Sequence, residues 1–197
     1  MATPQTETQP RIEHENPWFD VVFRDGFYCV ERKSPHVVQV LGITDDQKVP
    51  MIRQFRVPAN SYVFELPAGI DDKQYEDATT DDERLKRTAL EELDEECGFS
   101  ASHIQKLWSG PKSAGLANEY MHVFLAHQLT REHAGGGVGR EDIEVHLVDF
   151  HALPQFVLER SNCGIAVLNA YALAVAAANA GQLPEDLASI VLGRRGT

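Results

Sequence analysis

The order of secondary-structure signals predicts an α/β fold, an α/β/α sandwich with a mixed sheet. Strand-like segments stand before and after one long helix-like run, Glu83 to Phe99, and further helical patterns close the chain. Chains that mix strands and helices in this way form layered folds around one core. The 197 residues fit one domain, or one domain with a small appendage.

The first part of the chain predicts an N-terminal antiparallel strand meander. Residues 1–16 are polar, so we expect a flexible tail there, and residues 17–60 are assigned to N-terminal strands. Asp45-Asp46 marks a turn between two of them. Alternating apolar positions predict strands at Phe27 to Glu31, His36 to Ile43, Val49 to Phe55 and Tyr62 to Glu65.

Residues 61–197 are assigned to the main domain. Gly98 is a helix stop, and Gly135-Gly136-Gly137 with Gly139 predicts a mobile loop. Strands are expected at Ile104 to Trp108, Tyr120 to Leu129 and Asp142 to Phe150. Helices are expected at Ala152 to Glu159, Gly164 to Ala180 and Pro184 to Leu192.

Charge and composition narrow the class of function. A net charge of −12 argues against binding nucleic acid or an anionic membrane, because phosphates attract basic surfaces. No apolar run reaches membrane-spanning length, and the polar N-terminus does not resemble a signal peptide. The three cysteines form no CxxC pattern and are interpreted as reduced thiols. A cytoplasmic location is therefore expected.

The run from Glu83 to Phe99 carries six carboxylates. Glu91 and Glu95 form one i,i+4 pair, and Glu92 and Glu96 form another, a spacing at which like charges repel. Such repulsion is tolerated on a solvated face, or where a bound cation reverses it. Mg²⁺ and Mn²⁺ favour carboxylate oxygens together with phosphate and water. Glu92 and Glu96 on one helix face therefore indicate a metal site for phosphate chemistry.

The neighbouring residues resemble the Nudix signature, G-x5-E-x7-R-E-U-x-E-E-x-G-U, in which U is a bulky apolar residue. Gly69 takes the first place and Glu83 the second; the later places are matched by Glu92, Leu93, Glu95, Glu96, Gly98 and Phe99. The chain is thus identified as a member of the Nudix family. The resemblance implies the α/β/α fold and makes residues 61–197 the Nudix hydrolase domain.

Two features depart from the signature. Thirteen residues separate Gly69 from Glu83 where the family has five, an acidic extension of eight. Glu91 stands in the place of the arginine that, in the family, holds the glutamates in position. Arg87, one turn earlier, is spaced to pair with Glu91 or Glu83. The reversal is compatible with tighter metal binding, a raised carboxylate pKa or a crippled catalyst.

Segments outside the signature resemble the ADP-ribose pyrophosphatase branch. They are Ile52 to Gly69, Ser113 to Ala126, Arg140 to Val148 and the helix containing Ala170 to Leu173. Ala114 stands where that branch has the proline associated with ADP-ribose, which leaves other nucleotide sugars open as substrates.

The resemblance suggests roles for named residues. Glu92 and Glu96 are the expected metal ligands, with Glu95 as a third ligand or a water-orienting catalytic group. The main-chain carbonyl of Ala68 ligates metal in this branch. Glu141 follows the glycine-rich loop and is expected to be the general base or a further ligand; Glu144 is a weaker candidate.

Substrate contacts are expected farther towards the N-terminus. Arg56 is the candidate pyrophosphate clamp, because a guanidinium offers two donors to phosphate oxygens. Trp18 and Tyr28 are candidates for stacking a nucleobase, with a core or dimer-interface role as the alternative. The branch forms homodimers through N-terminal strands, so residues 17–60 are assigned to dimerisation and base binding.

The predicted function is metal-dependent hydrolysis of ADP-ribose or a related nucleoside diphosphate sugar to a nucleoside monophosphate and a sugar phosphate. The expected cofactor is Mg²⁺ or Mn²⁺. Two alternatives stay open: a hydrolase for another dinucleotide, and a catalytically weakened Nudix domain that binds nucleotide without cleaving it.

Overall fold

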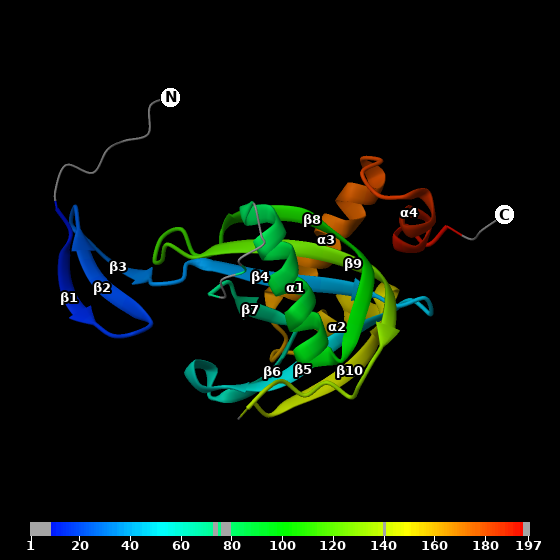
Figure 1. The fold of residues 1–197 in the computed structure, drawn as a ribbon, viewed down its shortest axis with the longest axis horizontal. Helices are drawn as coiled ribbons and strands as arrows, with labels where there is room; N and C mark the ends of the chain where they lie inside the picture. Colours follow the sequence, from blue (N-terminus) through cyan, green and yellow to red (C-terminus); the bar gives the residue numbers. More distant parts are fainter. Residues whose placement is uncertain (1–8, 73–74, 76–79, 140, 195–197) are drawn as a thin grey trace.

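The structure, a computed structural model, describes residues 9–72, 75, 80–139 and 141–194 (Figure 1). Its strands are β1 (Arg11–Glu15), β2 (Phe19–Arg24), β3 (Phe27–Arg32), β4 (His36–Ile43), β5 (Lys48–Arg56), β6 (Ser61–Glu65), β7 (Ala68–Ile70), β8 (Phe99–Pro111), β9 (Tyr120–Arg131) and β10 (Ile143–Asp149). Its α-helices are α1 (Asp81–Cys97), α2 (Leu153–Leu158), α3 (Ile165–Asn179) and α4 (Glu185–Val191).

A mixed sheet with the order β7-β4-β9-β8 forms the centre of the fold. Strands β4 and β9 run parallel, whereas β7 and β8 pair antiparallel to their neighbours. A second sheet, β10-β5-β6, lies beside it. Helix α1 covers one face, and α2, α3 and α4 lie on the other side (Figure 1). The predicted α/β/α arrangement with a mixed sheet is confirmed.

Helix α1 buries an apolar stripe and has defined ends. Leu85, Ala89 and Leu93 recur every four residues and pack in the core beneath the helix. At its start, the Thr80 side chain accepts a hydrogen bond from the Glu83 amide, and acidic residues follow in the first turn. At its end, Gly98 adopts a left-handed conformation with φ of 74°.

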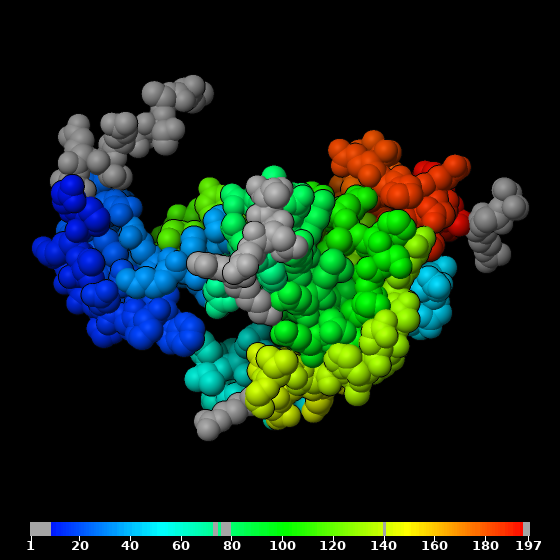
Figure 2. All heavy atoms as spheres, in the orientation of Figure 1, coloured from blue at the N-terminus to red at the C-terminus, as the bar shows by residue number. Residues whose placement is uncertain are grey.

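The antiparallel meander exists, but its members are β1, β2 and β3. The strand β1 lies in the segment for which a flexible tail was predicted, and β2 was not anticipated. All residues of β1 are exposed, so the strand depends on backbone pairing and leaves no apolar alternation in the sequence. This three-stranded sheet stands to one side of the main body (Figures 1 and 2).

Strands β4 and β5 do not continue that meander. Each lies in a different sheet, where it pairs with strands from later in the chain. Hydrophobic alternation identifies strands but does not say which strands pair. The predicted boundaries at residues 16 and 60 stay a prediction. In the described part of the chain, no helix has the length and apolar character needed to cross a membrane.

Candidate metal and pyrophosphate site

The last turn of α1 lies against β7. The Glu96 side chain is buried, with 4% of the residue exposed, and its Oε2 accepts a hydrogen bond of 2.9 Å from the Ala68 peptide N–H. The segment that begins β7 therefore lies directly against the acidic helix. Ala68 and Glu96, two of the predicted ligands, are thus adjacent, as a shared metal site requires.

One helical turn earlier, Glu92 contacts Gly69. A Cβ added at Gly69 would lie 2.0 Å from Glu92 Oε1 and 2.1 Å from its Cδ. A side chain at position 69 would therefore displace the carboxylate. This contact gives a physical reason for the glycine at the first place of the signature.

The glycine-rich loop is bound to the C-terminal end of α1. The amides of Gly136 and Gly137 each donate a hydrogen bond of 2.9 Å, to the carbonyls of Glu96 and Glu95 respectively. These carbonyls belong to the last turn, where intrahelical partners are lacking. A Cβ at Gly135 would meet the same helix end, 2.6 Å from the Glu96 carbonyl oxygen. The loop predicted to be mobile is thus anchored on the acidic helix through its glycines.

This anchoring brings Glu141 towards the site. Its Oε2 accepts a hydrogen bond of 2.9 Å from the Val138 amide, and a Cβ at Gly137 would lie 2.5 Å from the same oxygen. The Glu141 side chain is thus turned back onto its own loop. It is also close enough to Glu96 for its charge to alter the pKa of that residue.

The pKa of Glu96 is raised from 4.5 to about 8, chiefly by burial, with the charges of Glu92 and Glu141 acting in the same direction. The hydrogen bond from Ala68 and the charge of Arg56 act in the opposite direction. The charges of Glu92, on α1, and of Glu141, on the glycine-rich loop, therefore both act on the Glu96 carboxylate. A cation there would favour the ionised forms of all three.

Arg56 lies at the end of β5, with its Nε 2.6 Å from Glu65 Oε2 on β6. This ion pair links the arginine to the strand that leads into β7. The charge of Arg56 also lowers the pKa of Glu96, so the two side chains lie within electrostatic range of each other, and the clamp role stays a prediction.

The residues fit a hydrated magnesium ion better than a closed metal cage. Within the described ranges, no three histidine, cysteine, aspartate or glutamate side chains are close enough to form a cage. Mg²⁺ is usually held by one or two carboxylates, with water and substrate phosphate as the remaining ligands. Glu92 and Glu96 provide such a pair of hard oxygen donors, and the ligand roles stay a prediction.

Glu91, in the place of the signature arginine, contacts the extension. The Tyr75 hydroxyl donates a hydrogen bond of 2.8 Å to Glu91 Oε2. The guanidinium of Arg87 lies 5.8 Å from the centre of the Tyr75 ring. The extension of the signature therefore reaches the position at which the chain departs from it.

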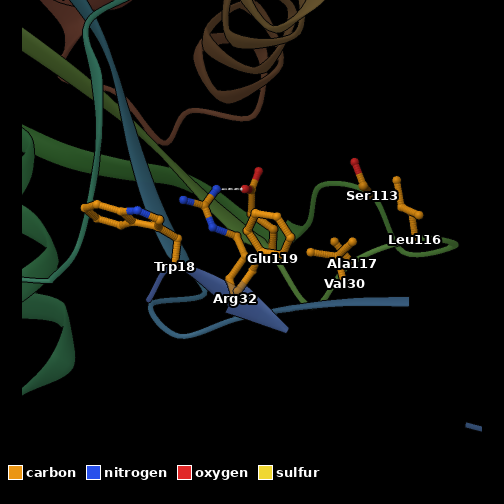
Figure 3. A pocket seen from close by; sticks show the side chains of 8 residues that line it. Trp18, Val30, Arg32, Ser113, Leu116, Ala117 and Glu119 are labelled. Atoms are coloured by element: carbon orange, nitrogen blue, oxygen red, sulfur yellow. Dashed lines mark hydrogen bonds and ion pairs between the residues drawn. The ribbon is translucent and has the colours of Figure 1, made fainter. Parts of the chain in front are cut away.

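Trp18 and Tyr28 are both exposed on the N-terminal sheet but line different depressions. Figure 3 shows Trp18 at one end of a depression of about 370 Å³, with the Arg32–Glu119 ion pair between it and the segment that carries Ser113. Trp18 also lines a depression of about 210 Å³ that reaches β7; its lining is Pro17, Trp18, Arg32, Lys33, Ser34, Ile70 and Asp72. Trp18, unlike Tyr28, therefore lines a depression that reaches β7.

Sequence reasoning missed a buried contact beside α1. The Asp71 side chain, 1% exposed, accepts hydrogen bonds from Arg84 Nε at 2.8 Å and Thr88 Oγ1 at 3.1 Å. Arg84 and Thr88 are four residues apart on the helix, which is a detectable spacing. Nothing in the sequence marks Asp71 as their partner.

Sequence reasoning also missed a chain of three polar side chains on neighbouring strands of the central sheet, His36, His122 and Ser109. His36 Nδ1 lies 3.0 Å from His122 Nε2, and Ser109 Oγ lies 2.7 Å from His122 Nδ1. Burial lowers the pKa of His122, with the nearby His36 acting in the same direction.

Comparison with known proteins gives several relatives, each matched over about half of this chain. The chain is 40% identical over 98 residues to a protein named ADP-ribose pyrophosphatase from Bacillus subtilis (strain 168), covering 50% of this chain and 49% of that protein. It is 33% identical over 109 residues to a GDP-mannose pyrophosphatase from Citrobacter koseri, covering 51% and 52%. A methanol dehydrogenase activator from Bacillus methanolicus is 33% identical over 117 residues, covering 59% and 58%. The chain thus spans about half the length of these curated relatives.

The fold has a counterpart among solved structures. A crystal structure of an ADP compounds hydrolase superposes with a TM-score of 0.65, covering 91% of this chain and 100% of that one at 18% identity. At that identity the likeness concerns the fold alone. No family model matches the chain.

The signature on α1 and the relatives together support the predicted resemblance to the Nudix family. Within that family it is similar to the ADP-ribose pyrophosphatase-like branch. The predicted resemblance is confirmed at both levels.

Proposed function

We propose that this chain is a metal-dependent pyrophosphatase that cleaves ADP-ribose or a related nucleoside diphosphate sugar to a nucleoside monophosphate and a sugar phosphate. The observation that carries the proposal is the convergence of Glu92, Glu96 and Glu141 beside Ala68. The relatives named as ADP-ribose and GDP-mannose pyrophosphatases support this substrate class.

The chain's own residues account for binding and proton transfer. Glu92, Glu96 and the Ala68 carbonyl would hold Mg²⁺ or Mn²⁺, with Glu95 as a further ligand or water-orienting group. Such an ion, when bound, stabilises negative charge on phosphate oxygens and lowers the pKa of a bound water. Arg56 would contact the pyrophosphate, and Glu141 would accept the proton of the attacking water.

The N-terminal sheet completes the proposal. Trp18 would stack on the base, and β1, β2 and β3 would contribute to a homodimer. The exposed apolar side chains of this sheet support an interaction role, since Trp18, Phe27 and Tyr28 are each more than half exposed. Light scattering of the purified protein would give the oligomeric state.

The decisive experiment measures formation of the nucleoside monophosphate and the sugar phosphate, through phosphate that an added phosphatase releases from these products. The substrates are ADP-ribose, GDP-mannose, other nucleotide sugars and dinucleotides, each with magnesium, manganese or a chelator. We expect metal-dependent cleavage of ADP-ribose or a nucleotide sugar, and its loss in Glu96→Gln. Turnover that survives in Glu96→Gln would contradict the ligand assignment.

A nucleotide-binding module without turnover is the second candidate, and Glu91 in the arginine place is the observation that favours it. Binding of ADP-ribose by calorimetry beside a flat turnover panel would identify that function. Glu91→Arg separates the two: it should raise turnover in a weakened enzyme and change nothing in a binding module.

A further inference from the structure

Two residues between β7 and α1, Asp71 and Tyr75, contact successive turns of the helix. Nearer the start of α1, the buried Asp71 carboxylate accepts hydrogen bonds from Arg84 and Thr88. About one turn farther along α1, the Tyr75 hydroxyl donates a hydrogen bond of 2.8 Å to Glu91 Oε2 and lies 3.4 Å from Thr88 Oγ1. The side chains of Asp71, Thr88, Tyr75 and Glu91 thus form a continuous chain of polar contacts.

The helical positions on this path share one side of α1. Arg84, Thr88, Glu91 and Glu95 follow the spacing i, i+4, i+7 and i+11, which places them along one stripe. Glu91 is therefore directly followed on the helix surface by Glu95, and its chain neighbour Glu92 contacts Gly69. A contact that fixes Glu91 thus bears on the turn that carries the proposed ligands.

The hydrogen bonds of Asp71 hold this residue, which follows β7, against α1. Asp71 has a side chain that is 1% exposed, and its partner Arg84 also pairs with Asp81 at the start of α1. Hydrogen bonds that involve charged groups at buried sites are stronger than neutral ones. Asp71, four residues before Tyr75, is thus held against the same helix that Tyr75 contacts.

We propose that Tyr75 is a positioning residue for the metal site and that, with Glu91, it takes over the role of the signature arginine. This inference rests on the proposed function. An arginine would hold neighbouring glutamates by charge, whereas a phenol hydroxyl holds Glu91 by a hydrogen bond from outside the helix. The charge reversal at Glu91 and the longer loop are then coupled, because the loop extension supplies a hydrogen-bond donor, the Tyr75 hydroxyl, to Glu91.

The test is Tyr75→Phe, which removes only the hydroxyl. We expect Mn²⁺ affinity, measured by calorimetry on the metal-free protein, to fall about tenfold, at the low end of the ~10- to 100-fold range for outer-shell partners. With a substrate that the wild type cleaves, kcat should fall while KM for the nucleotide changes less than twofold. Tyr171→Phe is the matched control, because Tyr171 lies on α3 and contacts Phe150 on the other side of the sheet.

Substitutions at Glu91 test the pairing itself. Glu91→Gln keeps an acceptor oxygen and should retain most of the Mn²⁺ affinity, whereas Glu91→Ala should lose as much as Tyr75→Phe. In a Glu91→Arg background the hydroxyl has lost its hydrogen bond to Glu91, so adding Tyr75→Phe should have no further effect. Additive losses in that background would overturn the proposal.

The readouts separate this inference from the proposed function. Tyr75→Phe that equals Tyr171→Phe in both Mn²⁺ affinity and kcat, or that lowers only the melting temperature, overturns the positioning role. A wild type that cleaves nothing, but whose Mn²⁺ affinity depends on Tyr75 and Glu91 as described, overturns the proposed function and supports the positioning role.

Discussion

Gly69 and Glu92 are so close that a side chain at position 69 would displace the Glu92 carboxylate: a Cβ there would lie 2.0 Å from it. The two residues are 23 positions apart in the sequence, 69 to 92. Their contact holds β7 against α1 at the level of the proposed metal ligands, next to the hydrogen bond between Ala68 and Glu96.

Gly69→Ala should therefore damage the metal site more than the fold. The added methyl group displaces the Glu92 carboxylate, and we expect Mn²⁺ affinity to fall by roughly 10- to 100-fold. Gly42→Ala is the control for overpacking, because a Cβ there would meet the flexible end of Leu129 at 2.9 Å and no carboxylate. Calorimetric titration and thermal unfolding of both variants check this. Equal losses of affinity would show that the contact has no special role.

Glu96 should make the metal-free protein less stable as the pH rises. Its pKa in the folded state, about 8, lies above its ordinary value of 4.5, because burial penalises the charge. The stabilisation from the neutral carboxyl is thus fully present below about pH 4.5 and is lost as the pH rises through about 8. Glu96→Gln cannot ionise and lacks this dependence.

Thermal unfolding with a chelator, from pH 5 to 9, measures this difference. We expect the wild type and Glu96→Gln to melt at similar temperatures near pH 5, and the variant to melt higher near pH 9. Added Mn²⁺ should stabilise the wild type chiefly at the alkaline end, where Glu96 is ionised. Parallel melting curves across the whole range would contradict the burial argument.

Glu141→Gln should lower kcat by about 10²- to 10⁴-fold, the usual contribution of a positioned general base. Its side chain is held on the loop that the glycines anchor to α1, and its charge acts on Glu96. Glu144 is the natural comparison, because its carboxylate is bound by Arg53 at 2.8 and 3.0 Å. Glu144→Gln should retain most of the turnover. A fall in Mn²⁺ affinity in Glu141→Gln, with kcat restored by excess metal, would make Glu141 a ligand instead.

The acidic helix was predictable from sequence because its chemistry is local. Six carboxylates, their spacing and the terminal glycine all lie within one helix, Glu83 to Phe99 in the prediction and Asp81–Cys97 in the structure. The sandwich fold followed from the order of strands and helices. The resemblance to the branch also implied that the Ala68 carbonyl would lie near the glutamates.

The contacts that the sequence did not predict are long-range. Tyr75 with Glu91 and Asp71 with Arg84 join a loop to a helix, and no periodicity encodes such pairs. The exposed strand β1 left no hydrophobic pattern. The glycine-rich loop suggested mobility, whereas its backbone amides bind the helix carbonyls that need partners.

Trp18→Ala should weaken nucleotide binding without affecting chemistry. Trp18 is 71% exposed, so its loss leaves the core intact, and one of the depressions that it lines reaches Ile70 and Asp72 beside the acidic helix. Stacking of a base on an aromatic ring contributes about 1–3 kcal/mol, or roughly 5- to 150-fold in affinity. KM for the best substrate should rise within that range while kcat is retained. Phe27→Ala is the control, because Phe27 is equally exposed on the same sheet but lines the depression with Tyr28 instead. A KM that is the same in both variants would place the base elsewhere on the protein.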